Sequence, residues 1–229
     1  MKKKAEKITT LEDLNKDTFS REWDFSSSTE VRIERIVTLV GQGKDVLDIG
    51  CYDGRISEKL LANKNKVYGV DVSPVAINKA KKRGIVASVC NFESEKLPKS
   101  FPQFDVVVAG ELIEHILDTD SFVQKAHSVL KKKGLFVITT PNLAGLGSRL
   151  SLLLGKLPWM IENDVLPGKS GHIRYFTLDE LRNLLERNRF MISEVTTDTV
   201  GVSAGISIPF LPRLFPRLGR SLIVKAIKK

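Results

Sequence analysis

The side chains best suited to chemistry lie at residues 111–115, Glu-Leu-Ile-Glu-His. If a helical turn begins at Glu111, then Glu111, Glu114 and His115 share one face. Two carboxylates and an imidazole suit a hard divalent cation such as Mg²⁺, with water or substrate oxygens completing the coordination shell. A distant histidine, His172, could join them as a fourth ligand. Without a metal, His115 or His172 is the candidate general base, because neutral imidazole can accept a hydroxyl proton near pH 7.

These residues also have a simpler structural interpretation. In it, Glu111 only closes a pocket, His115 packs beside it, and His172 hydrogen-bonds a loop. The third histidine, His127, lies within a predicted helix and is best explained as structural.

A second feature is a glycine turn, Gly50-Cys51-Tyr52-Asp53-Gly54, directly after the apolar run 46–49. It matches neither the Gly-x-Gly-x-x-Gly spacing of dinucleotide-binding folds nor the Gly-x-x-x-x-Gly-Lys-[Ser/Thr] of phosphate loops. Asp71 ends the next apolar run, where a carboxylate can accept both hydroxyls of a ribose. A glycine turn and a ribose-binding acid without a phosphate site suit a nucleoside such as S-adenosylmethionine. Alternatively, the glycines serve only a tight turn and Asp71 caps a helix.

The elements that must position these residues alternate regularly along the chain. Short apolar runs predict strands, and stretches with helical spacing separate most of them. Near-continuous apolar strands that alternate with helices indicate a parallel sheet covered on both faces, a doubly wound α/β domain. The predicted strands are 45–49, 67–71, 85–90, 104–109, 135–140, 190–195 and 222–224.

Two regions depart from this alternation within a predicted single domain, 1–229. Residues 1–43 are expected to form an N-terminal helical cap, with Ser26–Thr29 capping a helix. Residues 141–176 are an apolar insertion, expected to form a lid over the substrate together with residues 206–218. Basic amphipathic segments of this kind can lie in a membrane interface. They can equally pack on the sheet edge.

Composition limits the class of protein. The chain of 229 residues is 42% hydrophobic and 28% charged, which excludes disordered and fibrous proteins. Two cysteines cannot build a disulfide framework, so a reducing cytoplasm is the default. No signal peptide or membrane-spanning stretch is recognisable, and a soluble protein is expected.

The net charge of +9 is concentrated in one half. Residues 121–229 hold 17 Lys and Arg against 7 Asp and Glu, whereas residues 1–120 are close to neutral. A basic half favours an anionic partner such as nucleic acid, a phosphorylated small molecule or an acidic membrane. An ordinary solvated surface is an equal alternative.

Five motifs in order resemble those of class I S-adenosylmethionine-dependent methyltransferases, from about residue 30 to residue 196. The motifs are 46–54, Val70-Asp71, Asn91-Phe92, 104–109 and 130–135. The resemblance implies a Rossmann-like, seven-stranded sheet of order 3-2-1-4-5-7-6, with an antiparallel final strand at 221–227. It implies S-adenosylmethionine as cofactor, with these residues around it: Asp48, Gly50, Cys51, Gly54, Asp71, Val72, Asn91, Phe92, Gly110 and Glu111.

One residue departs from the family pattern. Tyr52 stands where the middle glycine of the usual three is expected. Its side chain must therefore point away from the cofactor. This departure is the only support for an alternative in which the protein is a catalytically inactive, cofactor-binding regulator.

The pattern Glu-x-x-Glu-His with a second distant histidine resembles two methyltransferase branches. One methylates the terminal ribose of small RNAs with a metal held by two Glu and two His, and the other comprises ubiquinone-pathway O-methyltransferases. Pro141-Asn142 and the segment 171–177 also resemble methyltransferases of surface-glycan and lipid modification. The expected acceptor is thus a hydroxyl of a glycan, glycolipid or isoprenoid-linked small molecule, with possible contact to an anionic membrane. RNA ribose 2′-O-methylation is less favoured, because no aromatic and basic stacking platform is recognisable.

Overall fold

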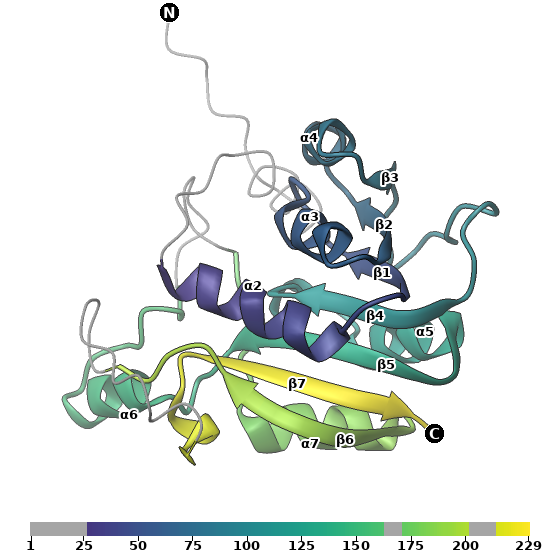
Figure 1. The fold of residues 1–229 in the computed structure, drawn as a ribbon. Helices are drawn as coiled ribbons and strands as arrows, with labels where there is room; N and C mark the ends of the chain where they lie inside the picture. Colours follow the sequence, from purple (N-terminus) through teal and green to yellow (C-terminus); the bar gives the residue numbers. More distant parts are fainter. Residues whose placement is uncertain (1–26, 163–170, 202–213) are drawn as a thin grey trace, which may run out of the picture.

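Figure 1 shows the fold in a computed structural model, which describes residues 27–162, 171–201 and 214–229. Seven strands form one sheet in the order β3-β2-β1-β4-β5-β7-β6. Strand β7 pairs antiparallel with both β5 and β6, and the other neighbouring strands are parallel. The predicted order and the antiparallel final strand are therefore confirmed. The strands are β1 (Asp45–Ile49), β2 (Lys66–Asp71), β3 (Val86–Val89), β4 (Phe104–Gly110), β5 (Leu130–Pro141), β6 (Phe190–Thr197) and β7 (Ser221–Lys228).

Helices cover both faces of the sheet (Figure 1). On one face pack α2 (Ser27–Val40), α3 (Arg55–Ala62) and α4 (Pro74–Lys82). On the other pack α5 (Thr119–Val129) and α7 (Leu178–Arg187). Thr177 caps α7, since its side chain accepts a hydrogen bond from the Glu180 amide.

The central strands are buried on both sides, which explains their continuous apolar sequence. In β4, Val106 and Val108 belong to the core beneath α2 and α3, whereas Val107 and Ala109 belong to the core beneath α5 and α7. Successive side chains of a strand alternate between faces, so two cores hold β4 in place. Its carboxyl end is thereby fixed where the candidate site begins.

The two irregular regions are described only in part. In the N-terminal region, α2 buries Ile33, Ile36 and Val40, while residues 1–26 lie outside the described residues. In the insertion, α6 (Leu146–Leu153) follows β5, and residues 163–170 lie outside the described part. Residues 206–213 of the second predicted lid segment also lie outside it. The division of the chain into a cap and a lid stays a prediction.

Among the helices that the structure describes, none combines the length and apolarity needed to cross a bilayer.

Candidate active site

A cavity of about 410 Å³ opens at the carboxyl ends of β1, β2 and β4. This is the edge at which doubly wound sheets bind their ligands. Asp48 and Gly54 are not among the lining residues. The other predicted cofactor residues do line the cavity, namely Gly50, Cys51, Asp71, Val72, Asn91, Phe92, Gly110 and Glu111.

The glycine turn brings backbone against the cavity. Gly50, Tyr52 and Gly54 all adopt positive φ, of 70°, 48° and 86°. The Gly50 and Cys51 amides both donate to the Val70 carbonyl, at 2.8 and 3.0 Å, which ties the turn to β2. A left-handed conformation favours glycine, so Tyr52 occupies a position where glycine would be less strained. Tyr52 also lines the cavity, and the orientation of its side chain away from a cofactor stays a prediction.

Asp71 has the environment that a ribose-binding carboxylate needs. Its Oδ1 accepts the Ser73 amide at 2.8 Å, and its Oδ2 accepts the Tyr52 amide at 3.0 Å. Burial raises the pKa of Asp71, and these backbone hydrogen bonds oppose the increase. A carboxylate oxygen has two lone pairs, so each oxygen can still accept a hydroxyl from the cavity. These free acceptor positions on Asp71 therefore fit the two hydroxyls of a nucleoside ribose.

Asp48 lies behind the glycine turn. It is fully buried on β1, and its Oδ2 accepts the Ser57 hydroxyl of α3 at 2.6 Å. Its Oδ1 has no hydrogen-bond partner among the described residues. Burial raises the pKa of Asp48 to about 7, and the nearby Asp71 raises it further, whereas the Ser57 hydrogen bond lowers it.

Glu111 closes the cavity and does not join the histidines. Its φ of 51° separates it from the following 3₁₀ turn, η1 (Ile113–His115). Its Oε1 accepts the Thr139 hydroxyl at 2.9 Å, and its Oε2 lies 3.4 Å from Arg32 Nη1 on α2. The predicted helical turn begins two residues late, so Glu111 does not share a face with Glu114 and His115.

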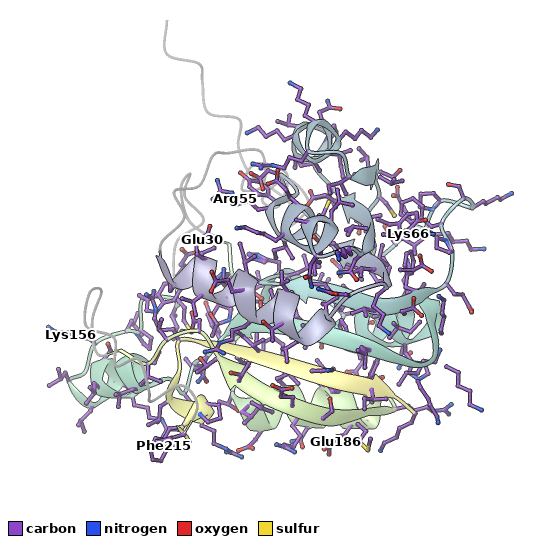
Figure 2. The ribbon with its side chains drawn as sticks, in the orientation of Figure 1. Glu30, Arg55, Lys66, Lys156, Glu186 and Phe215 are labelled. Carbon is purple, nitrogen blue, oxygen red and sulfur yellow. The ribbon has the colours of Figure 1, made fainter. Side chains whose placement is uncertain are left out.

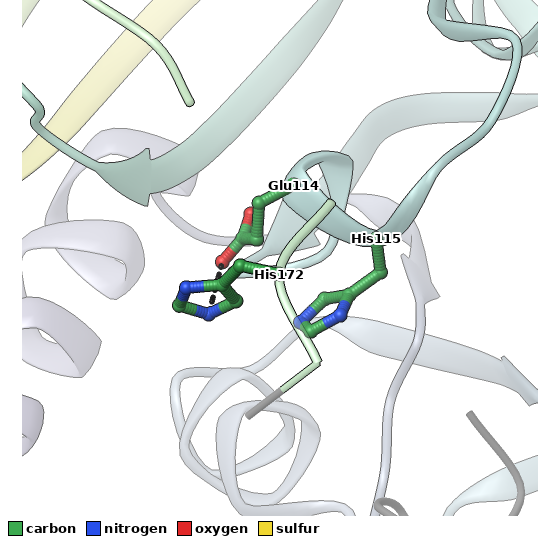
Figure 3. A group of neighbouring side chains, drawn as sticks. All are labelled: Glu114, His115 and His172. Carbon is green, nitrogen blue, oxygen red and sulfur yellow. Dashed lines mark ion pairs between the residues drawn. The ribbon is translucent and has the colours of Figure 1, made fainter. Parts of the chain in front are cut away.

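Glu114, His115 and His172 do come together (Figure 3). One ligand atom from each lies within 4.8 Å of the others, and the two imidazole ring centres are 5.1 Å apart. Glu111 is not part of this group, so the predicted set of four metal ligands is reduced to three. All three side chains line the same cavity as Gly50 and Asp71.

Backbone hydrogen bonds bring His172 to this place. The Ile173 and Arg174 amides both donate to the Glu114 carbonyl, at 3.0 and 3.1 Å. The Arg174 side chain donates to the Ile116 carbonyl at 2.9 Å and also to the Leu117 carbonyl. The His115 ring lies with Nδ1 3.2 Å from the Gly171 carbonyl. The return of the insertion is thereby held against η1.

The electrostatics of the cluster favour neutral groups. Burial raises the pKa of Glu114 well above its usual range, and the neighbouring Glu111 raises it further. Burial lowers the pKa of His115 to about 3, and His172 lowers it further. Burial also lowers the pKa of His172. Both imidazoles are therefore uncharged near pH 7 and can offer a lone pair to a proton or a metal.

Comparison with known proteins identifies the family. A family model described as a methyltransferase domain matches residues 27–195. The chain belongs to the S-adenosylmethionine-dependent methyltransferase family. It is 30% identical to the mitochondrial ubiquinone biosynthesis O-methyltransferase of Schizosaccharomyces pombe, covering 67% of this chain and 57% of that protein. It is 32% identical to the ubiquinone biosynthesis O-methyltransferase of Bradyrhizobium diazoefficiens, covering 67% and 61%.

This methyltransferase-family chain spans about three fifths of the length of those two relatives. Solved structures share its fold. A possible histamine N-methyltransferase from Thermotoga maritima aligns with a TM-score of 0.63 at 19% identity, covering 87% of this chain and 89% of that one. Magnesium protoporphyrin IX methyltransferase from Synechocystis aligns with a TM-score of 0.60 at 15% identity, covering 92% and 91%. These likenesses confirm the Rossmann-like architecture.

Several residues of this methyltransferase site are not predicted by the sequence motifs. Arg32 on α2 lines the cavity, and the sequence gives no signal of its contact with Glu111. Thr140, whose hydroxyl donates to Glu114 Oε2 at 3.0 Å, could have been suspected as a polar residue at the carboxyl end of β5. Trp159 and Arg220 also line the cavity, although they are distant from the motifs.

The buried Asp48 predicts a particular pH dependence of stability. Its carboxyl ionises near pH 7 in the folded protein and near pH 4 when unfolded. Unfolding thus releases a proton in between, and stability should fall as pH rises through this window. In urea denaturation from about pH 5 to about pH 7, Asp48→Asn should lose less stability than the wild type.

Asp105→Asn is the matched control, because the pKa of Asp105 is lowered and its charge is constant across this window. Parallel stability curves for wild type and Asp48→Asn would contradict the assignment.

Proposed function

We propose that this protein transfers a methyl group from S-adenosylmethionine to a hydroxyl oxygen of an isoprenoid-linked small molecule. The observation that carries the proposal is that the buried cluster Glu114, His115 and His172 opens into the same cavity as Asp71 and Gly50. The similarity to ubiquinone biosynthesis O-methyltransferases supports an isoprenoid-linked acceptor over a glycan or glycolipid. A cytoplasmic location belongs to the same proposal.

The residues divide into a cofactor side and an acceptor side. S-adenosylmethionine, when bound, supplies a methyl group on a positively charged sulfur. Asp71 accepts the ribose hydroxyls, and the amide-rich turn at Gly50 approaches the cofactor closely because glycine has no side chain. Phe92 and Ile116 give the cavity apolar walls beside Asn91, which suits an adenine ring.

On the acceptor side, His172 is the stronger candidate base. Its Nδ1 lies 3.3 Å from the Met160 carbonyl, an acceptor, so Nδ1 holds the ring proton and Nε2 keeps the lone pair. Nε2 can therefore take the proton of the attacking hydroxyl. Holding this hydroxyl in line with the methyl group accounts for much of the acceleration, since orientation alone contributes strongly to such reactions.

The cofactor assignment predicts the effect of replacing Asp71. Asp71→Asn removes a charged acceptor of two hydroxyls, which should weaken binding of S-adenosylhomocysteine by about 1.5–3 kcal/mol. Calorimetry measures this loss directly. Asp45→Asn is the control, because Asp45 pairs with Lys131 at the opposite end of β1. Unchanged affinity in Asp71→Asn would remove Asp71 from the ribose site.

The acceptor is tested with methyl-labelled cofactor and three compounds offered separately: a prenylated catechol, a lipid-linked sugar and a short RNA with a free terminal ribose. We expect label on a hydroxyl oxygen of the catechol. Preferential labelling of the RNA would favour the ribose 2′-O-methyltransferase alternative. Cofactor binding without turnover of any of these compounds would favour the inactive, regulatory alternative.

We further propose that Glu114, His115 and His172 can hold a divalent cation. Oε1 of the buried Glu114 has no hydrogen-bond partner among the described residues and lies 3.9 Å from His172 Nε2. Metal bonds to such ligands are about 2.0–2.2 Å long, so a small inward movement of the three ligands would suffice. A bound cation would lower the pKa of an acceptor hydroxyl, and it would also stabilise the charged form of Glu114.

The metal hypothesis predicts that a chelator lowers turnover strongly while S-adenosylhomocysteine still binds, because the cation serves the acceptor. Glu114→Gln should behave in the same way and should bind less metal when metal content is measured by mass spectrometry. Glu58→Gln, a change of an exposed carboxylate on α3, is the control. If turnover is complete in chelator, the imidazoles act without a metal.

A further inference from the structure

A group of apolar side chains faces solvent at one end of the molecule, around α6 and the loop that follows it. Leu153 is 81% exposed and Trp159 is 60% exposed. Folded domains normally keep large contiguous apolar patches covered, so a patch of this kind marks an interaction site. We call this group the α6 surface, and its members are Leu152, Leu153, Leu154, Leu157, Trp159, Leu214 and Phe215.

The sequence of α6 is unusual for a helix on a globular domain. Only Ser148 is buried within this helix, whereas its C-terminal leucines point into solvent. A helix that serves the domain core places its apolar stripe inward. The leucines of α6 therefore serve a contact outside the core.

Two segments far apart in the sequence make one surface. The Asn142 side chain, just before α6, donates to the carbonyls of Arg217 and Gly219, at 2.9 Å each. The backbone amide of Asn142 donates to the Arg220 carbonyl at 2.8 Å. These bonds hold the loop after Phe215 beside the start of α6. Figure 2 shows Lys156 and Phe215 at this same end of the molecule, far from Lys66.

The two segments that carry the α6 surface contain basic residues but no acidic ones, and an acidic neighbour, Asp179 of α7, pairs with Arg217. Residues 143–161 and 214–220 contain no Asp or Glu. They contain four basic residues, of which Arg217 is paired with Asp179 at 2.9 Å. The others are Arg149, Lys156 and Arg220. An apolar surface flanked by basic residues is complementary to an anionic bilayer, where leucine and tryptophan enter the interface and basic side chains meet the headgroups.

The α6 surface is continuous with the cavity. Trp159 belongs to both, and the Arg220 guanidinium lies 5.2 Å from the centre of the Trp159 ring. An acceptor with an apolar tail could therefore pass from a bilayer under α6 to the cavity.

We propose that the α6 surface docks on an anionic lipid bilayer and presents the cavity to acceptors dissolved in it. This inference rests on the proposed function only in its choice of a lipid-borne acceptor. The docking itself depends on the exposed leucines, on Trp159 and on the basic residues.

Sedimentation with vesicles tests the docking without any acceptor. Two vesicle types are compared at low salt: phosphatidylcholine alone, and equal parts of phosphatidylcholine and phosphatidylglycerol. We expect the wild type to bind the anionic vesicles and to bind the neutral ones far more weakly. Leu153→Asp should lower the partition coefficient about tenfold or more, because it puts a charge into the apolar contact. Lys156→Glu should lower it about 25-fold, since each charge near such a surface contributes about fivefold.

Two matched variants control for general effects. Val75→Asp places the same acid on an exposed apolar residue at the start of α4, and Lys66→Glu makes the same charge reversal on β2. Both should bind vesicles like the wild type. Circular dichroism and S-adenosylhomocysteine calorimetry on the same preparations confirm that each variant is folded.

The outcomes separate this inference from the proposed function. Absent binding to anionic vesicles, equal binding to neutral vesicles, or equal losses in the control variants would each overturn the docking. A dimer in ultracentrifugation that Leu153→Asp dissociates, without vesicle binding, would assign the α6 surface to a second copy instead. Intact cofactor affinity in these cases would leave the proposed function standing.

Discussion

The candidate site depends on one peptide carbonyl, that of Glu114, which accepts hydrogen bonds from the amides of both Ile173 and Arg174. Glu114 belongs to the turn after β4, whereas the two amides belong to the return of the insertion after β5. Because this carbonyl joins them, His172 reaches the cluster, and a wall of the cavity closes. Together with the bonds of the Arg174 side chain, these two bonds hold the second imidazole beside Glu114 and His115.

Buried carboxyl groups that oppose folding gather near the carboxyl ends of β1, β2 and β4. Glu114, Asp48 and Asp71 all have raised pKa values, and burial is the largest cause in each case. Buried charge is costly unless it is paired. Asp71 is compensated by backbone amides, whereas Asp48 and Glu114 each keep one oxygen without a hydrogen bond among the described residues. Perturbed carboxyls that gather around one cavity are typical of a functional site, and a ligand or cation there would offset part of their cost.

The sequence was sufficient wherever local pattern determines structure. The apolar runs predicted the strands, and the glycine turn with Asp71 predicted where the cavity lies. Family resemblance supplied the strand order and the proximity of His172 to Glu114.

What could not be predicted depends on side-chain pairing between distant segments: the contacts of Arg32 and Thr139 with Glu111 remove that carboxylate from the histidines. The start of the turn at Ile113 and not at Glu111 also decides which residues form the cluster, and spacing alone does not fix where a 3₁₀ turn begins. The exposure of Leu153 and Leu154 likewise depends on where the fold places α6, which the apolar sequence does not reveal.

The central claim is that the cluster held by the Glu114 carbonyl performs chemistry on the acceptor and is not merely a packed wall. Single-turnover methyl transfer by His172→Ala, at saturating cofactor, tests this claim most directly, with His127→Ala as the control because His127 lies on α5 and does not line the cavity. The account predicts that His172→Ala slows transfer by about 10²–10⁴-fold, with unchanged affinity for S-adenosylhomocysteine, while His127→Ala retains the wild-type rate. A wild-type rate in His172→Ala would contradict it.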